Sequence, residues 1–118
     1  MKKKVSGCAC QGANIEKFIQ PVILSILKKE TLTGYGVVKK MQDYSMFRFE
    51  QPDIAGVYKY LKNMEAKGYL EQTKVQNGEK TAHAGLHITE AGAGCLESWK
   101  QTLRVYQLSI TDLVRELD

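Results

Sequence analysis

The sequence has no apolar run that approaches the roughly 20 residues that a helix needs to cross a bilayer. Its longest candidate is the stretch from Pro21 to Leu27. Lysines occupy positions 2–4, but no apolar stretch follows them before Gly12, so we expect no secretory signal peptide. We therefore expect a cytoplasmic protein with no membrane partner, in which the three cysteines are thiols and not a disulfide framework.

The residue types that build active sites are also scarce. The chain has two histidines, no glycine-rich phosphate loop after a strand and no nucleophile with a base placed beside it, so we expect it not to be an enzyme. His83 and His87 lie four residues apart on one predicted strand, a separation of about 13 Å that is too long for joint ligation of one metal. We expect both at a surface or an interface.

Length and charge indicate one domain with a basic first part. The 118 residues are 43% hydrophobic, enough for a modest core that would gain from shared burial in a dimer. Residues 1–80 contain 14 Lys and Arg against 8 Asp and Glu, a net charge of +6. Residues 81–118 contain 3 against 5, a net charge of −2. The positive field therefore lies on the first two thirds of the chain.

The most organised stretch runs from Gln51 to Leu70. Its apolar residues recur at three- and four-residue steps, which predicts one buried side of a helix: Ile54, Val57, Tyr58, Leu61 and Met64. Pro52 suits the first helical turn, and Gly68 suits the position just past the end. The opposite face carries polar residues, mostly hydrogen-bond donors and positive charges: Asp53, Lys59, Tyr60, Lys62, Asn63 and Lys67. That face is either a solvated surface or one that meets phosphates and base edges.

A hairpin follows this helix directly. Residues 69–76 are rich in strand-compatible types, Asn77-Gly78 is a strong signal for a tight turn, and residues 80–88 can return as a second strand. A helix that leads straight into a two-stranded hairpin has the order of a winged helix-turn-helix. The predicted fold class is therefore mostly α with a two-stranded β wing, followed by a long C-terminal helix.

Three motifs resemble those of the PadR family of bacterial transcriptional regulators. The pattern P-x(5)-Y-x-x-L-x-x-M-E-x-x-G-Y-L resembles the recognition-helix signature of that family; it is formed by Pro52, Tyr58, Leu61, Met64, Glu65, Gly68, Tyr69 and Leu70. Residues 33–36, TGYG, resemble the family's opening of the second helix, and residues 88–92, ITEAG, resemble its exit from the wing. The resemblance covers most of the chain from about Phe18 onward.

The resemblance implies a homodimeric DNA-binding regulator, a repressor that binds a palindromic operator in double-stranded DNA. We expect a flexible, basic, cysteine-containing arm at residues 1–14, a winged helix-turn-helix DNA-binding domain at residues 15–89 and a C-terminal dimerisation helix at residues 90–118. The predicted DNA contacts are Tyr58, Lys59, Lys62 and Asn63 on the recognition helix and Lys74 and Lys80 on the wing. Asn63 would reach an adenine edge only with deep docking, and the lysines at 2–4 would add a salt-sensitive term.

The first helix is predicted from apolar residues at helical spacing between residues 15 and 29. Pro21 is awkward in a helix interior, so we favour a start near Gln20 over a kinked helix. In the turn before the recognition helix, Phe47 and Phe49 are expected to anchor the chain on the core. The alternative is a functional aromatic contact.

The second helix is predicted at residues 32–44, with three side chains turned inward: Tyr35, Val38 and Met41. Gly34 and Gly36 weaken this helix locally and permit close approach to a neighbouring backbone.

The second wing strand departs from the family pattern. Where the family is expected to have Arg or Lys followed by Tyr-Tyr, residues 81–88 read TAHAGLHI. This argues against a strong wing contact to DNA. Lys74 and Lys80 nevertheless flank the turn, where they would straddle a phosphate backbone or enter the minor groove, unless they are merely exposed.

The last segment carries a strict seven-residue repeat over about three heptads. The repeat consists of Leu96, Trp99, Leu103, Tyr106, Ile110, Leu113 and Leu117. So long a seam favours pairing with a second copy, and the alternative is packing against the chain's own first helix. The resemblance implies the same pairing, as in the small PadR-like proteins with a single C-terminal helix.

Trp99 has two interpretations. Some small family members bind planar aromatic drugs at the dimer centre, in a pore lined by a tryptophan on this helix, so the resemblance implies a site for a small aromatic effector at Trp99. The alternative is an ordinary core aromatic at a heptad position.

Cys8 and Cys10 lie in the arm at a spacing of two residues. They are either incidental thiols or half of a metal or redox site, which would need Cys95 or the partner's pair for full coordination. Two other functional classes stay open: a winged helix that serves as a protein-interaction adaptor, and a thiol or metal sensor in which DNA binding is secondary. Strong salt dependence of DNA binding would argue against the adaptor.

Overall fold

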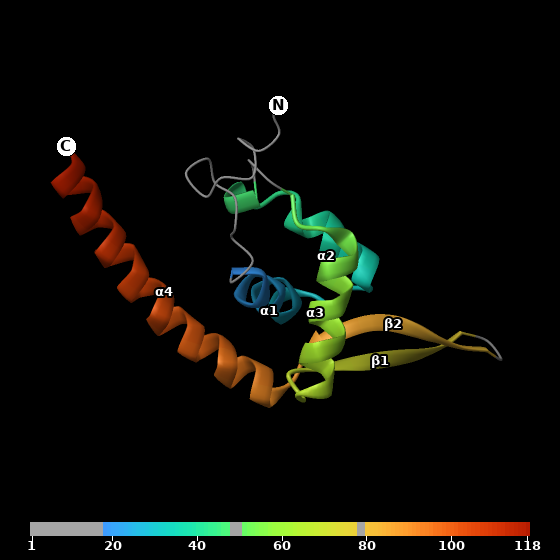
Figure 1. The fold of residues 1–118 in the computed structure, drawn as a ribbon. Helices are drawn as coiled ribbons and strands as arrows, with labels where there is room; N and C mark the ends of the chain where they lie inside the picture. Colours follow the sequence, from blue (N-terminus) through green and yellow to red (C-terminus); the bar gives the residue numbers. More distant parts are fainter. Residues whose placement is uncertain (1–17, 48–50, 78–79) are drawn as a thin grey trace, which may run out of the picture.

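The computed structural model describes residues 18–47, 51–77 and 80–118. Along the chain the elements are α1 (Ile19–Lys29), α2 (Gly34–Met41), the short 3-10 helix η4 (Ser45–Phe47), α3 (Ile54–Ala66), β1 (Leu70–Asn77), β2 (Lys80–Ile88) and α4 (Glu90–Leu117). Figure 1 shows a head made of α1, α2 and α3, a two-stranded wing that projects from it on one side, and α4 leaving it on the other. This is the predicted winged helix-turn-helix with a long C-terminal helix.

Helix α1 is the centre of the core. Its side chains Ile23 and Leu24 are fully buried, and it contacts α2, α3, β2 and α4. The rest of the core comes from the other elements that pack on α1, chiefly Val37, Met41, Phe47, Val57, Leu61, Met64, Leu70 and Leu86. Pro21 lies in the first turn of α1, where a missing N–H costs no intrahelical hydrogen bond. The favoured start near Gln20 is therefore confirmed.

Helix α2 is shorter than predicted and is rotated relative to the prediction. The Thr33 side chain caps its N-terminus by accepting a hydrogen bond from the Gly36 N–H at 3.1 Å. Val37 and Met41 are buried, whereas Tyr35 is 65% exposed, so the prediction that Tyr35 turns inward is wrong. The two residues before the helix lie outside it because the capping threonine fixes the first helical position at Gly34.

The predicted turn anchor is confirmed for Phe47, which η4 buries completely in the core. Phe49 lies outside the described residues. The Gln51 side-chain amide donates to the Phe47 carbonyl at 3.1 Å, which ties the end of η4 to the start of the segment that leads into α3.

The wing is an antiparallel pair, β1 with β2, that begins close to the head. Thr73 pairs with Gly85 and Lys74 with His83, so Ala84 has no partner residue and forms a bulge. The turn residues 78–79 lie outside the described part.

A short backbone bridge fastens the wing to the connection between α1 and α2. Leu32 exchanges two hydrogen bonds with Leu86, at 3.2 and 2.6 Å. Gly85 sits beside this bridge with φ +129°, and a Cβ there would collide with the Leu32 backbone. A glycine is therefore required at position 85, because the two backbones approach too closely for a side chain.

Helix α4 begins at the base of the wing. The Thr89 hydroxyl accepts from the Gly92 N–H at 3.1 Å and donates to the Gly68 carbonyl at 2.5 Å, which joins the end of α3 to the start of α4. A Cβ at the buried Gly92 would collide with the Tyr69 carbonyl. From there α4 runs for 28 residues, about 42 Å, well beyond the head.

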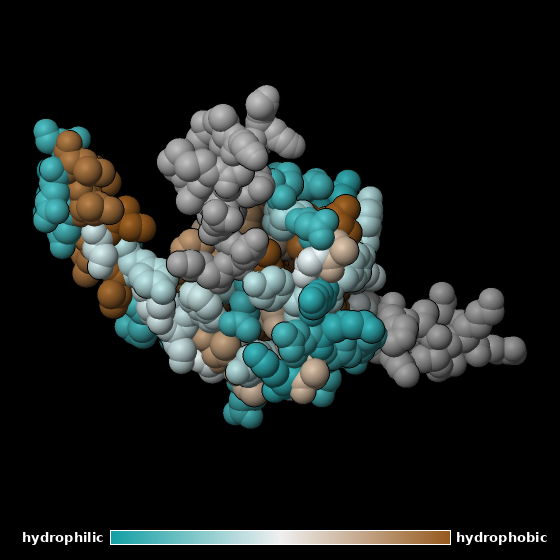
Figure 2. Space-filling view, in the orientation of Figure 1, coloured by the Kyte–Doolittle hydropathy of each residue, from teal (hydrophilic) through white to brown (hydrophobic). Residues whose placement is uncertain are grey.

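The seam of α4 is divided between the head and open surface. Leu96 and Trp99 pack against the core of the same chain, and the Tyr106 ring meets Phe18 edge-on at 6.3 Å. The last seam residues, Ile110, Leu113 and Leu117, are exposed. Figure 2 shows this hydrophobic surface over the free end of α4. The alternative of packing on the chain's own first helix therefore holds for the first half of the seam only.

In the part of the chain covering residues 18–47, 51–77 and 80–118, no helix is both long enough and apolar enough to span a membrane.

Candidate nucleic-acid interface

Both ends of α3 are fixed by local hydrogen bonds. The Asp53 carboxylate caps the N-terminus by accepting from the Gly56 N–H at 3.0 Å. Pro52 therefore precedes the cap, so the prediction that it occupies the first turn is wrong. At the other end Gly68 has φ +83°, and the N–H groups of Gly68 and Tyr69 donate to the carbonyls of Glu65 and Met64. This arrangement needs a left-handed residue, which explains the glycine just past the helix.

The buried side of α3 is a narrow stripe of Val57, Leu61 and Met64. Gly56, Tyr60 and Glu65 are half-buried. The other residues of α3 are exposed, including all four residues predicted to contact DNA from this helix: Tyr58, Lys59, Lys62 and Asn63. Figure 2 shows a mostly hydrophilic surface where α3 faces the viewer. The structure thus brings the four residues onto one accessible helix. Two residues predicted to be buried, Ile54 and Tyr58, are 57% and 42% exposed, so that prediction is wrong for both.

Tyr58 is seated against the start of α2. A Cβ at Gly34 would collide with Cε1 of the Tyr58 ring, so the ring lies directly over the glycine. The sequence predicted that a neighbouring backbone would approach Gly34 closely, but the group that approaches it is the Tyr58 side chain. Tyr58 and Lys62 also line a half-open cavity of about 220 Å³ between α2, α3 and β2. The ring position depends on the absence of a side chain at residue 34.

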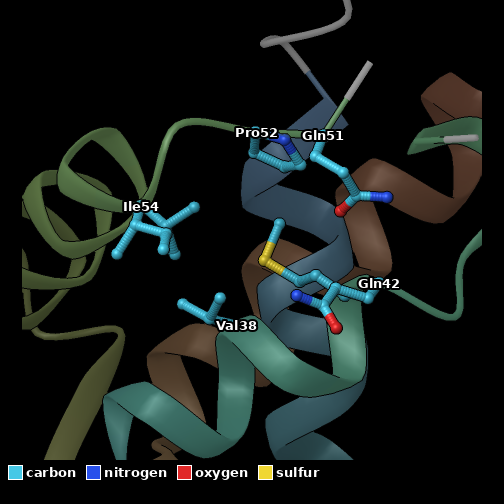
Figure 3. A pocket seen from close by; sticks show the side chains of 7 residues that line it. Val38, Gln42, Gln51, Pro52 and Ile54 are labelled. Atoms are coloured by element: carbon cyan, nitrogen blue, oxygen red, sulfur yellow. The ribbon is translucent and has the colours of Figure 1, made fainter. Parts of the chain in front are cut away.

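A second cavity, of about 130 Å³, lies between α2 and the start of α3 (Figure 3). Its walls are mainly apolar, with Val38 and Ile54 facing each other across it and Gln42 and Gln51 at its edge. Ile54 therefore borders apolar surface on one side and solvent on the other.

The positive charge of α2 is partly engaged by neighbours. The Lys40 ammonium lies 3.0 Å from the Glu30 carboxylate, and its hydrogen bond to that carboxylate raises the pKa of Lys40 above its usual value. The Lys39 ammonium lies 5.8 Å from the centroid of the Tyr35 ring. Both arrangements lie at an exposed surface, where such contacts are weak.

The wing places Lys74 on β1 and Lys80 on β2, but the side chains of residues 74–84 lie outside the described part, so no contact is assigned to either lysine or to His83. His87, at the base of the wing, is described. Its Nδ1 is hydrogen-bonded to the Thr73 hydroxyl, and its Nε2 lies 3.1 Å from the Glu71 carboxylate. It is half-buried on the wing surface, in agreement with the expected surface histidine.

Trp99 links α4 to α1. Its indole N–H donates to the Gln20 side-chain oxygen at 2.8 Å, and its ring packs against the core. Cys95 is a free, half-buried thiol on the same helix, and Cys8 and Cys10 lie outside the described residues. Among the residues that the structure describes, no group of three or more His, Cys, Asp and Glu side chains is placed to hold a metal ion.

The model of the transcriptional regulator PadR-like family matches residues 23–98, well over half of the chain. The chain belongs to the PadR-like family. The predicted family is thereby confirmed, and so is the prediction that the chain is not an enzyme, since the members of the family are transcription regulators. None of the curated proteins matches the chain.

Solved structures of PadR-like regulators share this fold. A PadR family transcription regulator from Clostridium difficile R20291 has a TM-score of 0.68 at 25% identity, over 82% of this chain and 98% of that one. A PadR-like transcriptional regulator from Bacillus cereus strain ATCC 14579 has a TM-score of 0.71 at 22% identity, over 85% of this chain and 94% of that one. Bacillus subtilis PadR, in complex with operator DNA, has a TM-score of 0.55 at 20% identity, over 76% of this chain and 58% of that one.

The exposure of Ile54 is a feature of this PadR-like head that sequence reasoning missed. Ile54 fits the apolar period of α3, which predicts burial, yet it is exposed at the first helical position. The cap at Asp53 is the signal that could have found it, because a residue directly after the cap lies at the helix end and has fewer neighbours to cover it.

Proposed function

We propose that this PadR-like protein is a homodimeric repressor that inserts α3 into the major groove of a palindromic operator. The observation that carries the proposal is the exposed face of α3, which presents two lysines, a tyrosine and an asparagine. The opposite side of the helix packs on the head through a narrow buried stripe. A recognition helix needs such a face, because it must be fixed to the head and open to the groove at once. Bacillus subtilis PadR, which shares the fold, is known in complex with operator DNA.

Lys59 and Lys62 are the proposed backbone contacts, since an exposed ammonium on a flexible stem can follow a phosphate without reading sequence. Tyr58 would donate from a ring held in place over Gly34. Asn63 lies in the second half of α3, so it would reach an adenine edge only if the helix docked deeply. Lys74 and Lys80 on the wing, and the lysines at 2–4, would add electrostatic attraction.

Dimerisation is proposed along the exposed end of α4. Tyr106 meets Phe18 where α4 leaves the head. Ile110, Leu113 and Leu117 continue the seam beyond that point, and Val114 lies beside them. Apolar residues scattered over a surface by chance would not follow a seven-residue repeat. The continuous stripe on α4 therefore favours burial against the same stripe of a second copy. The remaining seam residues Leu96, Trp99 and Leu103 would set the base of that interface.

A signal is proposed to release the repressor by altering the angle between the two heads. The hydrogen bond from Trp99 to Gln20 supports a role for Trp99, because it joins α4, which would form the dimer, to α1, the central helix of the head. A small aromatic effector that bound better with this bond broken would shift the equilibrium between two dimer geometries. Oxidation or metal binding at Cys8 and Cys10 is the second proposed route.

The proposal is tested by selecting duplexes from a random DNA pool with the full chain and titrating the enriched sequence at several salt concentrations. Lys62→Ala should weaken binding and lower the slope of log affinity against log salt by about one unit for each phosphate that is no longer neutralised. Lys100→Ala, which removes the same charge from α4 beside Glu97, is the matched control and should change neither quantity. No enrichment, or equal effects of the two variants, would refute DNA reading by α3.

A further inference from the structure

Ile54 is an aliphatic side chain at the leading end of an otherwise polar helix face. It is the first residue of α3, directly after the capping Asp53, and more than half of its surface is exposed. The next exposed residue is Ala55, and Tyr58 lies one turn further along on the same side as Ile54. These three residues form a contiguous apolar edge, which we call the α3 leading edge.

Ile54 contributes little to the packing of α3 on the head. Its side chain borders the cavity of about 130 Å³ opposite Val38 (Figure 3), yet the cavity leaves most of the side chain open. The stripe that holds α3 on the head is complete with Val57, Leu61 and Met64, all of which are fully or almost fully buried. Ile54 is therefore free to contact an external partner, and it lies at the end of α3 that would enter a DNA groove first.

We propose that Ile54 is a specificity-determining residue that contacts the C5-methyl group of a thymine in the major groove. The inference rests on the proposed DNA-binding function and names the base that the leading edge would favour. The residues that contact base edges from a recognition helix are those of its N-terminal part, where Ile54 and Ala55 lie.

Thymine follows from what each base presents in the major groove. Guanine, adenine and cytosine present only hydrogen-bond donors and acceptors there, whereas thymine adds a methyl group. An isoleucine cannot satisfy a donor or an acceptor, so pressing it against a purely polar edge would remove water from that edge without replacement. Against a thymine methyl, the isoleucine and the methyl group would each lose contact with water and gain an apolar contact.

Replacement of single thymines by deoxyuridine isolates this contact, because uracil pairs identically and lacks only the methyl group. The probe is the duplex recovered by selection from the random pool. For the unaltered protein we expect one thymine in each half-site at which the substitution weakens binding by about fourfold, the factor for removing one methyl group from an apolar contact. For Ile54→Ala the substitution at that position should have little effect.

Met46→Ala is the matched control, since Met46 is also an exposed apolar residue of the head but lies on η4 and not on the leading edge. It should keep the full sensitivity to deoxyuridine. If no single deoxyuridine weakens binding by the unaltered protein, or if Ile54→Ala stays as sensitive as that protein, the inference is wrong while DNA binding stands. If no duplex is enriched, the proposed function fails and the inference fails with it.

Discussion

Replacing Leu113 by aspartate separates the proposed dimer from the folding of the head. Leu113 is 54% exposed and belongs to the half of the α4 seam that extends beyond the core. Leu96 and Trp99, in contrast, pack against the core, so substitutions there would disturb folding and pairing together. A charged residue at position 113 should therefore leave the head intact and act on association alone.

The expected magnitude follows from the area that Leu113 still exposes. Full burial of a leucine side chain stabilises by about 1.5–3 kcal/mol, so burial of the exposed half contributes about 0.8–1.5 kcal/mol in each copy. A symmetric dimer contains the residue twice, which gives about 1.6–3 kcal/mol for the pair. The dissociation constant should rise at least about 15- to 150-fold, and the two buried carboxylates add to this.

Sedimentation velocity over a range of concentrations measures the change, with circular dichroism to verify that the helices are retained. Leu108→Asp is the matched control: Leu108 is 69% exposed on the same helix but lies five residues earlier, about 140° around it. We expect Leu108→Asp to associate like the unaltered protein. Equal dimer strength in Leu113→Asp, or equal weakening in both variants, would refute the seam as the interface.

Three glycine substitutions test the packing that positions α3 and α4. Gly92→Ala should lower the free energy of unfolding in urea by about 1–3 kcal/mol, because its Cβ would meet the Tyr69 carbonyl, which is backbone and cannot swing away. Gly94→Ala, two residues along the same helix with no atom within 4 Å of the added Cβ, should instead raise it by about 0.5–1 kcal/mol; destabilisation of similar size in both would contradict the packing. Gly34→Ala should displace the Tyr58 ring and weaken binding to the selected duplex severalfold without unfolding the protein, and unchanged affinity would show that the ring position does not matter.

The order of the elements was predictable because it rests on local signals. Asn77-Gly78 separated the two wing strands, and Gly68 marked the end of the recognition helix. Both signals depend on backbone conformations that few other residues adopt, so they indicate a turn or a helix end in most tertiary contexts.

The side that each helix buries was predictable only in part. At about 100° per residue, Val57, Leu61 and Met64 lie within about 60° of one another, whereas Ile54 and Tyr58 fall on one flank of this arc. All five residues fit the helical period and were therefore predicted to be buried, but α1 and α2 cover only the narrow arc. How much of a helix its neighbours cover depends on their placement, which the period of one helix does not contain.

Two further features could not be predicted from the sequence: the bridge from Leu32 to Leu86 and the bulge at Ala84. Each depends on where two distant segments meet. Gly85 could be recognised as unusual within a strand, but its reason, the Leu32 backbone beside it, appears only in three dimensions.

Protection of the selected duplex against dimethyl sulfate is the most direct test of two α3 helices acting on one DNA molecule, since this reagent modifies guanine N7 in the major groove. We predict two protected major-groove patches about one helical turn apart, roughly 34 Å, or a multiple of that spacing. Both patches should disappear together in Leu113→Asp at a concentration where the unaltered protein is dimeric. A single patch, or tight binding without any major-groove protection, would contradict the account.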